Sequence, residues 1–159
     1  MHALSEPAIY LGLSTQNPGP DGTQFLEPGV SLDDEVYKPY PEYLRVKIDG
    51  NGAFNIDRPL LSEATINSVT NCAEITNQDM ILFPEAVGIE DKEAQSGTGW
   101  GNIGWFGLFY GQWNEANTKD NKVPFLWGEI RDANGKQGVE IKYHEVPVIR
   151  TSSLVISIQ

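Results

Sequence analysis

The sequence WGNIGWFGLFYG at residues 100–111 alternates aromatic, aliphatic and glycine residues more densely than any other part of the chain. Alternation with a period of two is typical of a β-strand, whose successive side chains point to opposite faces of a sheet. We therefore expect residues 103–110 to form the central strand of an all-β domain. Glycine weakens a strand unless another group approaches closely, so Gly101, Gly104 and Gly107 predict tight packing over this strand.

The rest of the chain contains further short β patterns separated by turn residues. Sixteen glycines and ten prolines are spread over the 159 residues, which suits short strands and turns better than long helices. We count about eight to ten strands, which predicts one domain over residues 1–159, an antiparallel β-sandwich that is jelly-roll-like and has long loops. The strand patterns cover 9–14, 43–48, 74–76, 80–83, 103–110, 125–130, 139–143, 146–149 and 154–158. The segment 61–71 is open between a helical turn and irregular structure.

Two of these patterns carry more detailed expectations. The strict alternation over residues 43–48 predicts a half-buried strand with two sets of side chains. These are Leu44, Val46 and Ile48 inward, and Tyr43, Arg45 and Lys47 outward. The pair Asn134-Gly135 tolerates the positive φ of a tight turn, which predicts a β-hairpin that joins 125–130 to 139–143. Charged, Pro-rich or Gly-rich segments at 32–41, 90–99 and 114–122 are expected to be loops.

Composition excludes several classes of partner. The formal charge is −11, with 22 acidic and 11 basic residues, so we expect no binding to nucleic acid, which requires clustered Lys and Arg. No segment approaches the ~20 apolar residues of a membrane span, and residues 1–20 lack the pattern of a signal peptide. We therefore expect no membrane partner and assembly from the cytoplasm. The single Cys72 excludes an internal disulfide and is expected to be a small buried side chain.

The sequence offers little for catalysis. His2 and His144 lie far apart and have no metal-ligand spacing, and no nucleophile elbow or phosphate-binding loop occurs. We therefore expect no catalytic residue, no metal and no cofactor. Candidates for the paired carboxylates of a glycosidase are Asp33, Asp34, Glu35 and Glu42 in the first long loop and Glu90, Asp91 and Glu93 in the second, but charged runs in loops are usually solvated surface. Asp33, Asp34 and Glu35 also offer oxygen ligands for calcium, although their spacing matches no calcium motif.

Aromatic residues are the better candidates for contacts. Trp105 and Trp127 lie inside strand patterns and are expected in the core. Tyr37, Tyr40 and Trp113 lie beside polar loops, where an exposed or interface position is expected, either for stacking on a sugar or for a protein contact. Together with the acidic residues of the first long loop they form the set of binding or interface candidates: Tyr37, Tyr40, Trp113, Asp33 and Asp34.

The order of these segments resembles a family of small tail fibre and minor tail proteins of tailed bacteriophages. Residues 10–15 resemble the family's opening Tyr-x-x-Leu-x-Thr strand, and residues 17–22 resemble its Pro/Gly/Asp-rich turn. Similar motifs follow in the same order: Glu27-Pro28-Gly29, Tyr43-Leu44-Arg45-Val46, Phe83-Pro84-Glu85-Ala86, Trp100-Gly101, Phe106-Gly107-Leu108-Phe109, 126–130, Val146-Pro147 and 153–158. The resemblance spans nearly the whole chain, although the connections at 31–42, 90–98 and 114–122 are longer than is usual in the family.

The resemblance implies a non-enzymatic structural protein of a tailed-bacteriophage virion, associated with the tail, baseplate or fibre. Its expected partners are other virion proteins, further copies in a homo-oligomer, and a host surface glycan or protein. One alternative is a head decoration protein, or capsid cement. Alternatives from a different class are a carbohydrate-binding module and a polysaccharide depolymerase. The resemblance also implies that Glu27 and Arg45 pair across strands in a structural role.

Overall fold

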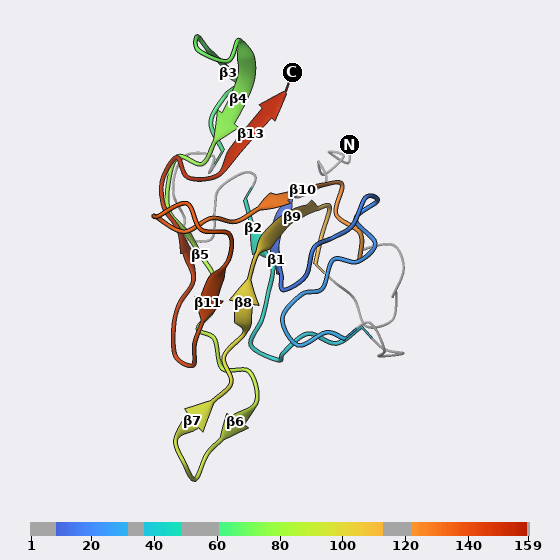
Figure 1. Ribbon diagram of the computed structural model, residues 1–159, viewed down its shortest axis with the longest axis vertical. Coiled ribbons are helices and arrows are strands. Elements are labelled where there is room, and N and C mark those ends of the chain that lie inside the picture. The colour runs from blue at the N-terminus through green and yellow to red at the C-terminus, as the bar shows by residue number, and fades with distance from the viewer. Residues whose placement is uncertain (1–8, 32–36, 49–60, 113–121, 159) are drawn as a thin grey trace, which may run out of the picture.

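A computed structural model of the chain describes residues 9–31, 37–48, 61–112 and 122–158. These residues form thirteen β-strands in five antiparallel sheets and contain no helix. The expected all-β, antiparallel and sandwich-like fold class is therefore confirmed. A small body lies in the middle of the molecule, and a β element projects from each end of it (Figure 1).

The largest sheet has four strands in the order β10-β9-β1-β2. Its strands are β1 (Tyr10–Ser14), β2 (Val46–Lys47), β9 (Trp105–Phe109) and β10 (Leu126–Glu129). Strand β1 pairs with β9 over its full length, from Tyr10 opposite Phe109 to Ser14 opposite Trp105. The aromatic and glycine-rich stretch thus supplies a central strand, as expected.

The strand expected over 103–110 is divided at Gly104. Strand β8 (Gly101–Ile103) pairs with β11 (Val139–Ile141) in a sheet of two strands, whereas β9 belongs to the sheet of four. The backbone N–H of Gly104 donates to the Ser14 carbonyl at 3.1 Å, and its carbonyl accepts from the N–H of Ile130 at 2.8 Å. The chain therefore passes from one sheet to the next at this glycine.

The predicted hairpin around Asn134-Gly135 is correct for its turn and wrong for its strands. The N–H of Asp132 donates to the Lys136 carbonyl at 2.9 Å, and Gly135 has the expected positive φ of 80°. Strands β10 and β11 do not pair with each other, because β10 pairs with β9 and β11 with β8. The turn therefore carries the chain between the same two sheets that meet at Gly104.

The other strands form small sheets around the body. Strand β12 pairs with β5, β6 pairs with β7 in a hairpin, and β13-β4-β3 form a sheet of three strands that we call the projecting sheet. The hairpin lies in a segment expected to be a loop, and β3 lies in the segment left open. The bounds are β3 (Thr65–Asn67), β4 (Cys72–Thr76), β5 (Ile81–Leu82), β6 (Glu90–Asp91), β7 (Ser96–Gly97), β12 (Val148–Ile149) and β13 (Val155–Ile158).

The core joins β1 to the segments that pack across it. Trp100 is buried, whereas Trp105 and Trp127 are only half-buried, so the core position expected for these two is wrong. Trp127 packs against Gly22 at the outside of the sheet instead. Cys72, expected to be buried, is half-buried. The core cluster consists of Leu11, Leu13, Tyr43, Val46, Ile48, Ile81, Phe83, Ala86, Trp100, Ile103, Leu108, Ile141 and Leu154.

The side-chain directions expected for residues 43–48 are partly wrong. Tyr43 and Arg45 are buried, with exposed fractions of 0% and 2%, whereas Leu44 is 51% exposed. Val46 and Ile48 are buried and Lys47 is exposed, as expected. The alternation reverses between Arg45 and Val46, because only Val46–Lys47 is a paired strand and the residues before it turn toward buried polar partners.

The predicted close packing over glycines is confirmed at Gly107. A Cβ atom at this position would lie 2.7 Å from Phe25 Cε2 and 2.9 Å from Pro124 Cβ, both shorter than any ordinary contact. Gly101 is different, since no atom lies within 4 Å of such a Cβ. Its backbone has a φ of +77°, which L-residues rarely adopt, so conformation explains this glycine.

Candidate functional site

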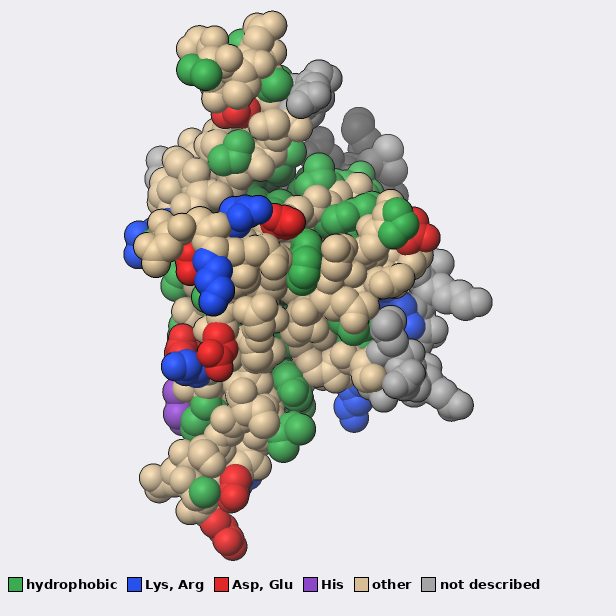
Figure 2. Space-filling view, in the orientation of Figure 1, with side chains coloured by type: hydrophobic (Ala, Val, Ile, Leu, Met, Phe, Trp, Pro, Cys, Tyr) green, Lys and Arg blue, Asp and Glu red, His purple; other side chains and the backbone are tan. Residues whose placement is uncertain are grey.

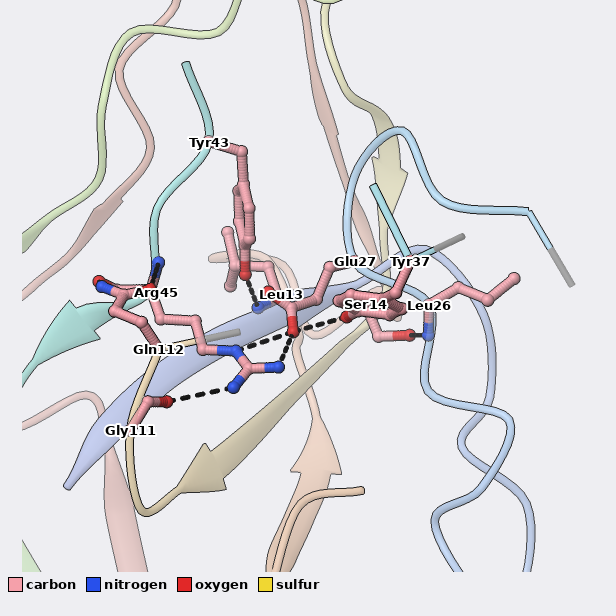
Figure 3. Close-up of polar contacts among 9 residues, drawn as sticks. All are labelled: Leu13, Ser14, Leu26, Glu27, Tyr37, Tyr43, Arg45, Gly111 and Gln112. Atoms are coloured by element: carbon pink, nitrogen blue, oxygen red, sulfur yellow. Dashed lines mark hydrogen bonds and ion pairs between the residues drawn. The ribbon is translucent and has the colours of Figure 1, made fainter. Parts of the chain in front are cut away.

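A buried polar network lies against one face of β1 and joins segments that are distant in the sequence (Figure 3). The side chains of Glu27 and Arg45 form an ion pair in which both are 0% exposed. Arg45 Nε donates to Glu27 Oε1 at 2.7 Å, and the Tyr37 hydroxyl donates to the same oxygen at 2.7 Å. The pairing implied by the resemblance is thus observed, although both residues lie outside the strands.

Arg45 also fixes the chain where β9 ends. Its Nη1 donates to the Gly111 carbonyl at 3.0 Å, and its Cζ lies 3.6 Å from the centroid of the Phe109 ring. The backbone N–H and carbonyl of Arg45 are both hydrogen-bonded to the Gln112 side chain. One arginine therefore connects the turn at Glu27, the segment before β2 and the end of the central strand.

Charge and burial shift the ionisation of this network in a consistent way. Burial opposes the charge of Arg45, but the adjacent Glu27 carboxylate outweighs it and raises the pKa of Arg45. Burial, followed by the charge of Glu27, raises the pKa of Tyr43 well above its ordinary value, and the pKa of Tyr37 is raised for the same two reasons. These shifts favour the charged form of Arg45 and the neutral form of both tyrosines.

Tyr37 was expected to be an exposed contact residue, and this prediction is wrong. Its side chain is 4% exposed because its hydroxyl is held by Glu27 within the buried network. Tyr40 is half-buried and packs against the core, and its N–H donates to the Pro28 carbonyl at 2.9 Å. The remaining candidates, Asp33, Asp34 and Trp113, lie outside the described residues.

A second junction at Glu42 was not predicted from the sequence. Its Oε1 accepts hydrogen bonds from the N–H groups of Val87 and Gly88 at 2.8 and 2.7 Å, and from Trp100 Nε1 at 2.8 Å. Burial disfavours the ionised carboxyl, but these hydrogen bonds outweigh it and the pKa of Glu42 lies below its ordinary value. The signal that could have found this contact is the buried Trp100, whose indole N–H requires an acceptor.

An open groove with a volume of about 570 Å³ lies between the turn that follows β10 and the segment from β12 to β13. Its lining combines apolar side chains with the charged side chains of Glu129, Arg131, Asp132 and Arg150. The lining residues are Phe106, Glu129, Ile130, Arg131, Asp132, Ala133, Val139, Val148, Ile149, Arg150, Ser153, Leu154 and Val155. Sequence reasoning missed this groove because it is assembled from four separate segments, none of which has an unusual pattern.

The carboxylates of the groove are both engaged in local structure. Glu129 Oε2 accepts from Arg131 Nη2 at 2.8 Å on the surface. Asp132 Oδ1 accepts from the N–H groups of Asn134 and Lys136, both at 2.9 Å, and so closes the turn. Acidic and basic side chains lie close together on the side of the body shown in Figure 2. The groove therefore has the chemistry of a mixed apolar and charged contact surface.

The described acidic residues proposed for a glycosidase pair do not line this groove, and Asp33, Asp34 and Glu35 lie outside the described residues. Glu90 and Asp91 lie in β6 on the projecting hairpin, both exposed, and neither lines the groove. Asp91 Oδ1 caps the hairpin turn by accepting from the N–H of Glu93 at 3.1 Å, and Glu90 Oε1 accepts from the Tyr143 hydroxyl at 3.1 Å. Their geometry is that of a surface turn.

Two searches of the described residues bear on other classes of site. Within 9–31, 37–48, 61–112 and 122–158, no group of three or more His, Cys, Asp and Glu side chains is placed to hold a metal ion. The same residues contain no helix that is long and apolar enough to cross a membrane.

The fold and the site define an all-β protein that has an enclosed ion-pair network, an open surface groove and β elements projecting from both ends (Figure 1). Comparisons of the chain with protein-family models, with curated proteins and with solved structures find no match.

Proposed function

We propose that this chain is a non-enzymatic structural protein of a tailed-bacteriophage virion, associated with the tail, baseplate or fibre. The observation that carries the proposal is the shape. The projecting sheet and the β6–β7 hairpin extend from opposite ends of the body (Figure 1). Such elements gain little packing within one chain and can reach neighbours on two sides, as a subunit of an assembly requires.

Exposed apolar side chains on these elements support the same proposal. On the projecting sheet and its turn, Ile66 is 68% exposed and Val69 is 91% exposed, and Ile89 beside the hairpin is 68% exposed. At the end of β9 the exposed rings of Tyr110 and Phe125 stack with centroids 4.3 Å apart. Apolar groups that stay in contact with water in a single chain are favourable sites for contacts between proteins.

The order of motifs gives the proposal its biological setting. The Glu27-Pro28-Gly29 and Tyr43-Leu44-Arg45-Val46 motifs resemble those of small phage tail proteins, and their Glu27 and Arg45 side chains meet in the core. In a symmetric particle many copies act together, so that a weak contact to a host glycan or protein becomes useful through effective concentration. The mechanism we propose is therefore shape combined with avidity.

Immunogold electron microscopy of phage particles from the source culture, with an antibody raised against the purified chain, tests the proposal. Label on the tail, baseplate or fibres is the expected result. Label on the capsid would instead support the alternative of a head decoration protein. Particles that carry no label, together with absence of the chain from their mass-spectrometric protein inventory, would reject a virion role. An enzymatic role would be supported by release of oligosaccharides from host polysaccharide by the purified chain.

A further inference from the structure

The two faces of the projecting sheet differ sharply in polarity. In the register of the sheet Ile66 lies opposite Ala73 and Ile156 lies opposite Ile75, and partners in an antiparallel pair share a face. One face therefore carries Ile66, Ala73, Ile75 and Ile156. The other face carries Thr65, Asn67, Cys72, Glu74, Thr76, Val155 and Ser157. The base of the apolar face packs on the core through Ile156, whereas Ile66 remains exposed.

Strand β13 forms one edge of this sheet, and its sequence carries none of the charged or proline residues that block further pairing at many edges. Among the described residues, β13 pairs only with β4. Natural edge strands are protected from further pairing by Lys, Pro or bulges, and the sequence VISI of β13 contains neither Lys nor Pro. No charged side chain occurs from residue 151 to residue 159, within a chain of net charge −11. Within the described part of the chain, this edge therefore has no pairing partner, and its own side chains carry no charge.

We propose that β13 of one chain pairs antiparallel with β13 of a second copy, so that two projecting sheets join into one sheet of six strands. The backbone N–H and C=O groups along the edge of one strand can form hydrogen bonds with those along the edge of another strand. Two copies that each carry −11 repel one another, which favours a contact through strands that carry no charged side chain, such as β13. Two-fold antiparallel pairing also places Ile156 of both copies on the same face, which keeps the apolar face continuous.

This inference adds to the proposed function by naming a second copy of the chain as the partner. It rests on the proposed function for its biological setting. It can be tested without the virion. A purified chain that is monomeric would overturn the β13 contact and leave the virion role standing. Particles that lack the chain would reject the virion role and leave the β13 contact standing.

Ser157 and Thr65 provide a matched pair of positions for the test. Both are exposed and lie on the polar face, in one row on either side of Glu74, with Ser157 on edge strand β13 and Thr65 on edge strand β3. Ser157→Lys and Thr65→Lys each add one positive charge beside Glu74. They change the net charge of the chain equally, and only Ser157→Lys places like charges near each other across the proposed interface.

Sedimentation velocity over a range of concentrations measures the self-association of the three proteins. We expect the original chain and Thr65→Lys to form dimers with similar affinity. For Ser157→Lys we expect the dimer affinity to fall by about tenfold or more. Mixing Ser157→Lys with Ser157→Asp should restore dimers, because opposite charges then face each other. Circular dichroism spectra that match the original chain establish that the variants fold.

Three outcomes would overturn the proposal. A chain that stays monomeric at all concentrations shows that no second copy pairs with β13. Equal weakening by both lysine variants places the contact elsewhere on the sheet, for example on its apolar face. The third outcome is that Ser157→Lys leaves the dimer affinity unchanged and that mixing the lysine and aspartate variants gives the same affinity as either variant alone. This result shows that another surface or another occupant is involved.

Discussion

At the scale of single residues, Glu27 and Arg45 form the most consequential interaction in the described interior. The carboxylate accepts hydrogen bonds from both Arg45 and Tyr37 on one oxygen, while its other oxygen, Oε2, is buried and has no hydrogen-bond partner among the described residues. A buried pair of this kind stabilises a protein less than its Coulomb energy suggests, because both charges lose their water. Removing one partner is nevertheless severe, since the other charge is left unpaired.

Replacement of Arg45 therefore gives the first prediction. Arg45→Met should lower the free energy of unfolding by about 3–5 kcal/mol, because it leaves the Glu27 carboxylate buried without its cation. Chemical denaturation at pH 7 measures the change. The control is Arg131→Met, which removes an exposed pair with Glu129 and should cost about 0–1 kcal/mol.

The double variant separates the lost charge from the lost packing. Glu27→Leu combined with Arg45→Met removes both buried charges and should recover part of the stability lost in the single variant. If Arg45→Met unfolds at the same denaturant concentration as the original chain, the ion pair does not hold the three segments together.

Glu42 gives a prediction about acid stability. Its pKa in the folded protein is lowered by hydrogen bonds that outweigh the effect of burial. Its contribution to stability is therefore complete above the ordinary glutamate value of about 4.3 and is lost as the pH falls through the lower pKa of the folded state. Glu42→Gln should cost about 1 kcal/mol at pH 7, and its difference from the original chain should shrink as the pH falls below the ordinary glutamate value of about 4.3.

The measurement is the unfolding midpoint of both proteins across this pH range. Glu140→Gln is the control, because Glu140 is exposed on β11 and its replacement should leave the curve unchanged. A difference between Glu42→Gln and the original chain that is the same at pH 7 and pH 3 would contradict a role for the ionised carboxyl.

At the scale of elements, the decisive feature is the division of the expected long strand into β8 and β9. Strand β9 pairs on both sides, with β1 and β10, and lies beneath Phe25 and Pro124. Only glycine fits at Gly107, because its Cα faces those two side chains directly. The position of this glycine therefore determines how closely the loop around Phe25 packs onto the central sheet.

The prediction at this scale is that Gly107→Ala destabilises the protein by about 1–3 kcal/mol, because the new methyl group would overlap with the Phe25 ring. Thermal unfolding measures the loss. Gly135→Asn is the control, since that position has a positive φ and no atom within 4 Å, and asparagine tolerates such a conformation. Gly107→Ala with an unchanged melting temperature would show that the Phe25 loop moves away freely.

At the scale of the whole molecule, net charge and shape have opposite effects on the association of two copies of the chain. The projecting sheet offers an uncharged strand edge, whereas the charge of −11 makes two copies repel. Salt screens charges that are more than about 10 Å apart but leaves backbone hydrogen bonds and apolar contacts largely intact. The balance between these two effects should therefore depend on ionic strength.

We expect raising NaCl from 50 to 500 mM to strengthen the association of the chain with itself, because repulsion is screened. Light scattering at fixed protein concentration measures the average mass at each salt level. The same series with sucrose in place of salt is the control for general solvent effects. Association that weakens as salt is added would show that attraction between opposite charges holds the copies together.

Strands and turns of this protein were predicted correctly from the sequence where a pattern of neighbouring residues determines the local structure. A short apolar run identified β1, alternation identified the C-terminal strand, and turn residues located the bend at Asn134-Gly135. The direction of Tyr43, Leu44 and Arg45 was mistaken, because hydrogen bonds to Leu13 and Glu27 overrode the alternation. The exposed position of Tyr37 was mistaken for a similar reason, since its partner is ten residues away in the sequence.

By itself, the sequence determined that the chain is an all-β protein of many short strands, because side-chain alternation and turn chemistry act over a few neighbouring residues. Only the tertiary structure decided which strands pair, where the chain changes sheets at Gly104, and which segments line the groove. It also decided that Glu42 meets Trp100 across 58 residues. These features depend on contacts between distant segments, whose energies no local pattern records.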